Sequence, residues 1–343
     1  MNPADLNLEP AYFIQATGSG DWPGDQLIDA IYRIRGELGA PHLPFLPQLN
    51  QVGYRNTSLA RTCCCLSELE FDLASFGWRL SSGSSNEGRL ARSSWAGAIN
   101  TLADLIGQES SPGQNLKIQL LGPISLANQI YLPSGERASS DPGARRDLRD
   151  SFLAGLPDWL RLLQEAAPGQ HLILQVDEPD LGPVLAGKVA SVSGYRNLPA
   201  VTVQEAAETY SIYSRQLEPL VSQVILATPQ LENALPFAAY FAGITLNLSY
   251  NNTSDWEKLA EHLEAGRRAW LGLPTGQEAE SLTKQAHTFW RMWRMIGLPA
   301  KTVELLTLTE GPGIKNLNPQ QATAALGRLT ELARAVSEIA QDD

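Results

Sequence analysis

The sequence predicts an α/β protein folded as a TIM, or (β/α)8, barrel. Two observations support this prediction: eight strand-like runs are spread along 343 residues, and most of them are followed by a helical run. Short strands that alternate with helices indicate parallel βα units, and eight such units favour a closed barrel. A doubly wound open sheet is the alternative fold. We expect a tail at 1–10 and a single barrel domain at 11–343, because neither a linker nor a repeat divides the chain.

The strand-like runs are short and apolar, as is typical of strands in a parallel sheet. They lie at 12–17, 70–80, 116–121, 172–176, 223–227, 243–248, 269–273 and 303–308. The run at 70–80 alternates apolar and polar residues, so it fits either one strand or a hairpin. The stretch at 40–47 is rich in proline, and we expect it to be irregular. The glycine-rich turn at 18–24 lacks the third glycine of a dinucleotide-binding fingerprint.

Helical periodicity separates or follows these runs. The predicted helices lie at 25–38, 58–66, 94–106, 125–132, 142–166, 203–217, 256–265, 278–296 and 319–339. The part of the eighth helix at 283–296 carries several Trp, Phe and Met residues, which is typical of a helix face packed on a barrel. If any of these side chains were exposed, they would instead form a surface for a partner.

Composition excludes several classes of protein. The net charge of −11 disfavours a nucleic-acid partner, because phosphate recognition needs a basic surface. No apolar run approaches the roughly 20 residues that span a bilayer, so no membrane role is expected. The segment 1–10 is acidic and polar and does not resemble a signal peptide. We therefore expect a cytoplasmic protein.

The chain has three cysteines, and they are consecutive: Cys63, Cys64 and Cys65. This arrangement fits neither a disulfide framework nor a CxxC zinc site. Neighbouring side chains on a helix point about 100° apart, so they do not converge easily on one ion. We interpret the three as small apolar residues of the core.

Two adjacent carboxylates, Asp177 and Glu178, follow the apolar run at 172–176. Such a pair is costly to bury, and in a barrel the carboxyl ends of the strands carry the chemistry. Both residues are therefore candidates for substrate binding. For Glu178 a structural role is the alternative, in which it caps a helix or pairs with an arginine.

Four motifs occur in order along the chain, most of them at expected strand ends: ATGSGDWPG at 16–24, GPISL at 122–126, RA at 137–138 with DPGARRDL at 141–148, and QVDEP at 175–179. This set resembles the cobalamin-independent methionine synthase family. It is most similar to the short actinobacterial members, which correspond to the catalytic C-terminal barrel of the long enzymes. The resemblance implies a TIM barrel, as the strand pattern does.

The resemblance also implies an activity, the transfer of a methyl group from methyltetrahydrofolate to homocysteine in methionine biosynthesis. In that family a zinc ion binds the homocysteine sulfur and keeps it as the nucleophilic thiolate. Zinc of this kind needs soft or borderline ligands. The family supplies a His-x-Cys after one strand, an acidic residue after the next, and a Cys after the last.

This chain departs from the family at each of these positions. Ile225 and Ala227 replace the His-x-Cys pair, Asn247 replaces the acidic ligand, and Glu310 replaces the final Cys. The only cysteines lie far away in the sequence, at 63–65. We therefore predict that the zinc-thiolate chemistry is absent, with no metal ligands at these positions and no cofactor.

The expected amino-acid pocket is altered as well. Asp21 occupies the position of a family serine that helps to bind the homocysteine backbone. Two like charges about 4 Å apart repel by about 1 to 4 kcal/mol, so homocysteine should bind poorly in the family's pose. Asp177 matches a family residue that contacts the substrate amine. Trp22 is interpreted as a packing residue at the rim, with a stacking platform for a pterin as the alternative.

An acidic barrel mouth remains, and we expect a small-molecule ligand there. Its predicted ligand-binding residues are Ser19, Asp21, Trp22, Asp177, Glu178 and Glu310. They predict an amine-bearing small molecule or a hard cation. For Asp21 and Glu310, solvated loop carboxylates are the alternative. Two other functions stay open: an active methyltransferase with a different thiol activation, and a non-catalytic barrel that binds a metabolite or a protein partner.

Overall fold

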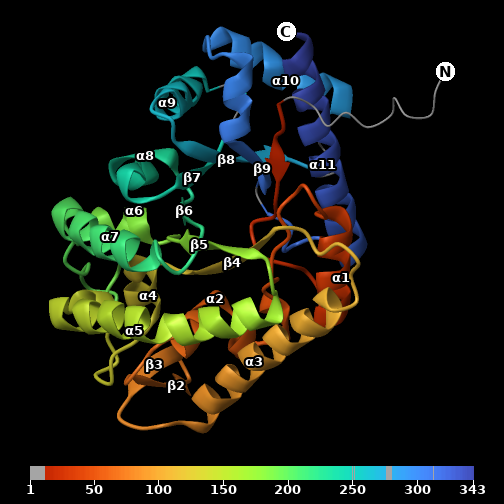
Figure 1. Ribbon diagram of the computed structural model, residues 1–343. Coiled ribbons are helices and arrows are strands. Elements are labelled where there is room, and N and C mark those ends of the chain that lie inside the picture. Colours follow the sequence, from red (N-terminus) through yellow and green to blue (C-terminus); the bar gives the residue numbers. More distant parts are fainter. Residues whose placement is uncertain (1–11, 249, 251, 276–279, 312) are drawn as a thin grey trace.

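The computed structural model describes residues 12–343 except 249, 251, 276–279 and 312, so the predicted tail at 1–10 lies outside the described residues. A curled parallel sheet of seven strands occupies the centre, and helices cover its outer side (Figure 1). Its strands are β1 (Gln15–Ala16), β4 (Asn115–Leu121), β5 (His171–Asp177), β6 (Gln223–Ala227), β7 (Gly243–Asn247), β8 (Arg268–Pro274) and β9 (Leu306–Gly311).

The strand order is β1-β9-β8-β7-β6-β5-β4, and every pairing in this sheet is parallel. The first and last strands of the chain are neighbours, because Gln15 pairs with Thr307. This order follows the sequence without a switch point, so the doubly wound alternative is wrong. The predicted α/β class is confirmed, because a curled parallel sheet forms the centre of the molecule.

The position between the edge strands β1 and β4 is taken by residues 43–48. Leu43 N donates to Ala16 O at 2.9 Å, and Leu46 N donates to Lys117 O at 3.0 Å. This proline-rich stretch contains no helix or regular strand, as expected, but its second half hydrogen-bonds to both edge strands. A proline lacks only the donor and keeps its carbonyl, and Pro44 O indeed accepts from Lys117 N at 2.9 Å.

The run at 70–80, counted above among the barrel strands, is instead a separate antiparallel hairpin of β2 (Glu70–Ala74) and β3 (Gly77–Ser81). Its alternation reflects a sheet with only one buried face. Phe71 and Trp78 lie on that face and are almost fully buried. The hairpin packs beside the long helix α3, away from the central sheet (Figure 1).

The helices are α1 (Leu27–Glu37), α2 (Ser58–Cys64), α3 (Asn86–Ile106), α4 (Pro123–Gln129), α5 (Pro142–Ala166), α6 (Leu181–Leu185), α7 (Val203–Leu217), α8 (Leu231–Ala234), α9 (Thr253–Glu264), α10 (Leu282–Met295) and α11 (Pro319–Asp342). Each of the nine predicted helices has a counterpart, but α3 begins eight residues earlier than predicted, and the short helices α6 and α8 were not predicted. Short 3-10 helices are η1 (Asn50–Val52), η2 (Tyr54–Asn56), η3 (Ala138–Ser140), η4 (Leu235–Tyr240) and η5 (Ala300–Leu305). None of the helices described is long and apolar enough to cross a bilayer.

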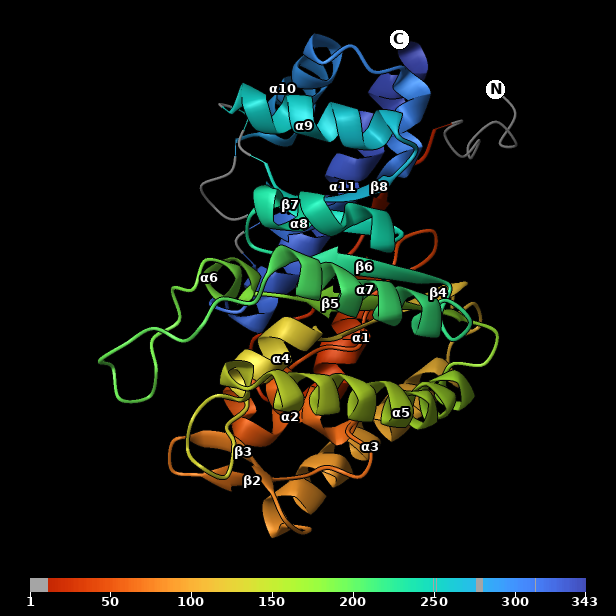
Figure 2. The same cartoon turned by 90° about the vertical axis from the view of Figure 1, so that its left-hand side faces the viewer.

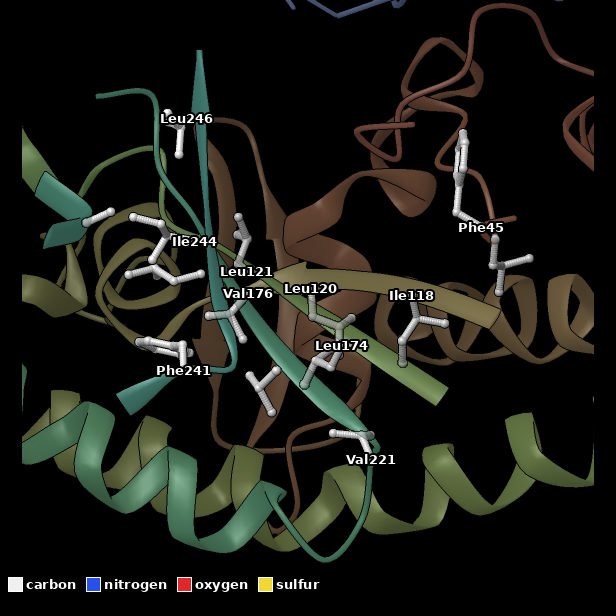
Figure 3. Close-up of a cluster of buried hydrophobic side chains, with 14 of the residues drawn as sticks. Phe45, Ile118, Leu120, Leu121, Leu174, Val176, Val221, Phe241, Ile244 and Leu246 are labelled. Carbon is white, nitrogen blue, oxygen red and sulfur yellow. The ribbon is translucent and has the colours of Figure 1, made fainter. Parts of the chain in front are cut away.

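The main apolar core lies between the sheet and the helices. Alternate strand residues such as Ile118, Leu174 and Val176 are buried there, and Figure 3 shows them gathered above the helices. The other face of each strand carries the opposite set, because side chains alternate along a strand. On that inner face β4 and β5 place Lys117 and Gln175, which are buried and polar. The inner face therefore carries the functional side chains.

Candidate functional site

A pocket of about 510 Å³ opens at the carboxyl ends of the central strands. The lining residues come from β4, β5, β6, β7 and β9, from the loops after β1, β5, β6 and β9, from the segment 43–48 and from the start of α2. They are Ser19, Asp21, Gln48, Ser58, Leu121, Gln175, Asp177, Pro179, Ala227, Pro229, Thr245, Leu246, Asn247, Thr309, Glu310, Gly313 and Lys315. This is the end of the sheet where parallel α/β proteins place their active sites.

Three carboxylates from distant parts of the chain share this pocket: Asp21, Asp177 and Glu310. Asp177 is the last residue of β5, and Glu310 lies inside β9, which begins and ends three residues later than the predicted run. Ser19 also lines the pocket. The structure thus brings together four of the six predicted ligand-binding residues. Whether they bind a ligand is taken up under Proposed function.

Asp177 and Glu310 are joined by a chain of hydrogen bonds through Gln175 and Ser19. Gln175 Nε2 donates to Asp177 Oδ1 at 2.7 Å and to Ser19 O at 2.8 Å. The Ser19 backbone N and its Oγ both donate to Glu310 Oε1, each at 2.7 Å. One oxygen of each carboxylate is therefore held in place before any ligand arrives, which reduces the ordering cost of binding.

A buried lysine supports this network from below. Lys117 Nζ donates to Gln175 Oε1 at 2.8 Å and to Gly18 O, and it lies 5.1 Å from the ring centroid of Phe45. Burial lowers the pKa of Lys117 to about 8, while the charges of Glu310 and Asp177 act in the opposite direction. A second lysine, the exposed Lys315, is among the residues that line the pocket.

The pocket carboxyls have altered proton affinities. Burial raises the pKa of Asp177 to about 7, against the opposing effects of the Gln175 hydrogen bond and the Lys117 charge. Burial also raises the pKa of Glu310, although its hydrogen bonds from Ser19 favour the ionised form. Asp177 can therefore gain or lose a proton near neutral pH, a property of groups that act as acid or base or that receive a cation.

Glu178 has a different role from its neighbour. It is fully buried and accepts from Ile124 N at 3.0 Å, Ser125 N at 2.7 Å and Tyr210 OH at 2.9 Å. These amides belong to the first turn of α4, so the carboxylate caps that helix. The pocket lining does not include Glu178. The structural alternative is the correct one, and the ligand-binding prediction for Glu178 is dropped.

Trp22 is also a packing residue. Its side chain is almost fully buried in the main core, and it is not part of the pocket lining. A stacking platform would need an exposed ring face, so the alternative role with a pterin is not supported. The three cysteines are buried as predicted, and burial raises the pKa of all three thiols. Such thiols are inert rather than reactive.

Four positions, Ile225, Ala227, Asn247 and Glu310, were predicted from the sequence to correspond to the family's zinc ligands. Ile225 fills an apolar cluster with Leu43, Ile173 and Trp270, while Ala227, Asn247 and Glu310 line the pocket. An alkyl side chain, a methyl group and an amide do not provide the soft or borderline donors of a zinc-thiolate site. Across the described residues there is no group of three His, Cys, Asp or Glu that could hold a metal ion.

The sequence analysis gave no role to Gln175 or Lys117. Both stand on strands that are otherwise strongly apolar, in the pairs Lys117/Gln119 and Gln175/Asp177. Residues two apart on a strand face the same side, so this spacing was a signal for a polar inner face. Gln48 and Ser58 carried no such signal, because neither lies in or directly after a predicted strand.

No protein-family model matches the chain, and no curated protein matches it in sequence. Among solved structures, the chain is similar to a B12-independent methionine synthase from Shewanella sp. W3-18-1 in complex with selenomethionine. The TM-score is 0.56, and the match covers 96% of this chain and 98% of that chain at 14% sequence identity. The two proteins share a fold.

This likeness to the methionine synthase concerns architecture alone, because the sequences have diverged so far. It confirms the predicted resemblance at the level of the fold, over nearly the whole length of both chains. The short actinobacterial type, the lost zinc site and the ligand stay predictions.

Proposed function

We propose that this protein is a diverged relative of the B12-independent methionine synthases that binds an amine-bearing small molecule at the carboxyl ends of its strands. The observation that carries the proposal is the gathering of Asp21, Asp177 and Glu310 around one pocket of about 510 Å³. In this proposal residues 43–48 serve as the eighth strand and close the barrel between β1 and β4.

The charge of the site favours a cationic ligand. Burial works against the ionised forms of Asp177 and Glu310, and the Lys117 ammonium offsets this only in part. An ammonium group in the pocket would add positive charge beside the three carboxylates and supply new N–H donors. The structural neighbour was solved in complex with selenomethionine, which itself bears an amine.

An amine fits better than a hard cation. Calcium takes six to eight oxygen ligands, and its carboxylate ligands often use both oxygens. Here Glu310 Oε1 already accepts two hydrogen bonds from Ser19, and Asp177 Oδ1 accepts one from Gln175. Those oxygens are committed to protein donors, whereas an ammonium needs only one acceptor for each N–H.

The proposal includes the loss of zinc-thiolate chemistry, because Ile225, Ala227 and Asn247 lack the required donors. Elemental analysis of the purified protein should give no stoichiometric zinc, and homocysteine should not be methylated in the presence of methyltetrahydrofolate. One zinc per chain together with methyl transfer would overturn this part and support an active methyltransferase.

The binding proposal is tested by thermal shift with pairs of molecules that differ only in an amino group, such as methionine and 4-methylthiobutanoate. A ligand that binds only the native state must raise the apparent stability, so the amine of each pair should shift the melting temperature more. If each deaminated partner shifts the melting temperature as much as its amine does, the carboxylates do not select an ammonium group, and the proposal fails.

A further inference from the structure

We infer that Glu310 Oε2 anchors the ligand and that the ligand carries a primary ammonium on a small polar body, not a quaternary ammonium or an aromatic ring. This inference rests on the proposed function and narrows its ligand class. The observation behind it is a buried carboxylate oxygen, Glu310 Oε2, that lacks a hydrogen-bond partner among the described residues.

Glu310 is only 3% exposed, and its two oxygens differ sharply. Oε1 accepts from both Ser19 N and Ser19 Oγ at 2.7 Å, whereas Oε2 has no hydrogen-bond partner among the described residues. A buried acceptor left unpaired costs about 1–3 kcal/mol. Glu310 lines the pocket, so a ligand that displaces the atoms covering Oε2 and donates to it would remove that cost.

The number of N–H donors then decides which amines fit. A primary ammonium has three, so it can donate to Glu310 Oε2, to Asp177 and to a neutral oxygen such as that of Thr309 or Asn247. Each N-methyl group removes one donor and adds apolar volume beside the carboxylates. A trimethylammonium has no N–H and leaves Oε2 unpaired.

The rest of the pocket supports the same class. No aromatic side chain lines it in the part of the chain that the structure describes. Quaternary ammonium groups are usually recognised by aromatic faces, and flat rings by stacking on them. The neutral lining is instead rich in hydroxyl and amide groups: Ser19, Gln48, Ser58, Gln175, Thr245, Asn247 and Thr309. The side chains of Ser19, Gln48, Ser58 and Gln175 already hydrogen-bond within the protein. Thr245, Asn247 and Thr309 are therefore the groups that would match hydroxyl or carboxylate groups on the ligand.

The test is calorimetric titration with ethanolamine, N-methylethanolamine, N,N-dimethylethanolamine and choline. In the unmodified protein, affinity should fall along this series by at least about tenfold from ethanolamine to choline, equal to about 1.4 kcal/mol. Glu310→Gln should weaken ethanolamine binding by about tenfold or more and flatten the series. Glu304→Gln, an exposed position outside the pocket, is the matched charge control and should change neither.

If Glu310→Gln folds poorly, Ser19→Ala serves instead, since it removes one of the two donors that orient the carboxylate. It should weaken ethanolamine binding and keep the order of the series. Choline binding as tightly as ethanolamine would overturn the inference and leave the proposed amine site intact. If none of the four compounds binds, and amines have no effect in the thermal-shift pairs, both this inference and the proposed amine-binding function are overturned.

Discussion

At the scale of single residues, Asp177 and Glu178 are neighbours in the chain but lie in different surroundings. Asp177 lines the pocket, and Glu178 caps helix α4. Successive residues at the end of a strand face opposite sides of the sheet, so one points into the pocket and the other into the packing between strand and helix. Glu178 Oε1 even lies 2.3 Å from the place where a side chain at Gly122 would begin, which explains the glycine at that position. The Asp-Glu pair is thus one carboxyl that lines the pocket and one that caps a helix.

Replacement of Glu178 by alanine should destabilise the fold. The change strips a partner from Ile124 N, Ser125 N and Tyr210 OH, all within 3.0 Å of the carboxyl oxygens. We expect a loss of about 3–5 kcal/mol in the free energy of unfolding, measured by urea denaturation. Glu261→Ala on the exposed side of α9 is the control. A loss below about 1 kcal/mol would contradict the capping role.

Substitution of Asp177 should change how stability depends on pH. Its pKa rises from 3.8 to about 7 on folding, so the native state binds a proton that the unfolded state releases. That contribution is fully present below pH 3.8 and is lost as pH rises through 7. Asp177→Asn keeps an oxygen for Gln175 Nε2 and removes the titration.

The Asp177→Asn variant should therefore be more stable than the unmodified protein at pH 8, by about 1–3 kcal/mol, with a smaller difference at pH 5. Urea denaturation at the two pH values measures this. A difference that is the same at both pH values would show that the side chain is ionised normally in the native state.

Loss of Lys117 should raise the proton affinity of the pocket. Its charge lowers the pKa of both Asp177 and Glu310. In Lys117→Met these carboxyls should ionise at higher pH, so the pH midpoint of ethanolamine binding should move upward. Titrations across pH 6–9 would show it, and an unchanged midpoint would indicate that the lysine does not act on the carboxyls.

At the scale of elements, local sequence signals set where the helices begin and end. The packing of one helix against another depends on residues far apart in the chain. Helix α5 begins at Pro142 after the N-cap Asp141, whose carboxylate accepts from Ala144 N at 2.9 Å. Pro at the first position and Asp at the cap are common start signals. Nothing local explains Gly155 in the middle of this helix. A side chain there would meet the backbone after α2, 2.2 Å from Cys65 O.

Two glycine substitutions in helix interiors should therefore have opposite signs. Gly155→Ala should destabilise by about 1–3 kcal/mol, because backbone atoms must move. Gly97→Ala on α3 meets no atom within 4 Å and should stabilise by about 0.5–1 kcal/mol through helix propensity. Thermal and urea unfolding of both variants make the comparison. Equal effects would mean that α5 does not approach α2 so closely.

At the scale of the whole molecule, residues 43–48 hydrogen-bond to both edge strands of the sheet. If they close the barrel, their amides can open only when the whole sheet opens. Leu43 N, Leu46 N and Lys117 N should then exchange with deuterium as slowly as amides in the central strands. Fast exchange at 43–48, with slow exchange elsewhere in the sheet, would mean that the sheet is open there.

The extended segment between α6 and α7 is the most protruding part of the molecule, as Figure 2 shows. Tyr195 lies there and is 96% exposed. By contrast, most of the apolar face of α10 is buried, as the sequence predicted: Phe289, Trp290, Met292 and Trp293 pack into the core, and Met295 is 53% exposed.

The sequence by itself determined the α/β class, the bounds of α5 and α7, and the carboxylates Asp21, Asp177 and Glu310 that line the pocket. Periodicity and side-chain chemistry are local properties, and they can be read without coordinates. They predicted which residues lie at the pocket, but not every residue with which these form hydrogen bonds.

Only the tertiary structure decided that 43–48, and not 70–80, lies between β1 and β4. It also decided that Glu178 leaves the pocket and that Lys117 lies beneath it. The physical reason is that strand order and burial arise from contacts between residues far apart in the chain. A proline-rich segment can pair once two edge strands offer it donors and acceptors, and a carboxylate takes its role from whichever donors the fold brings to it.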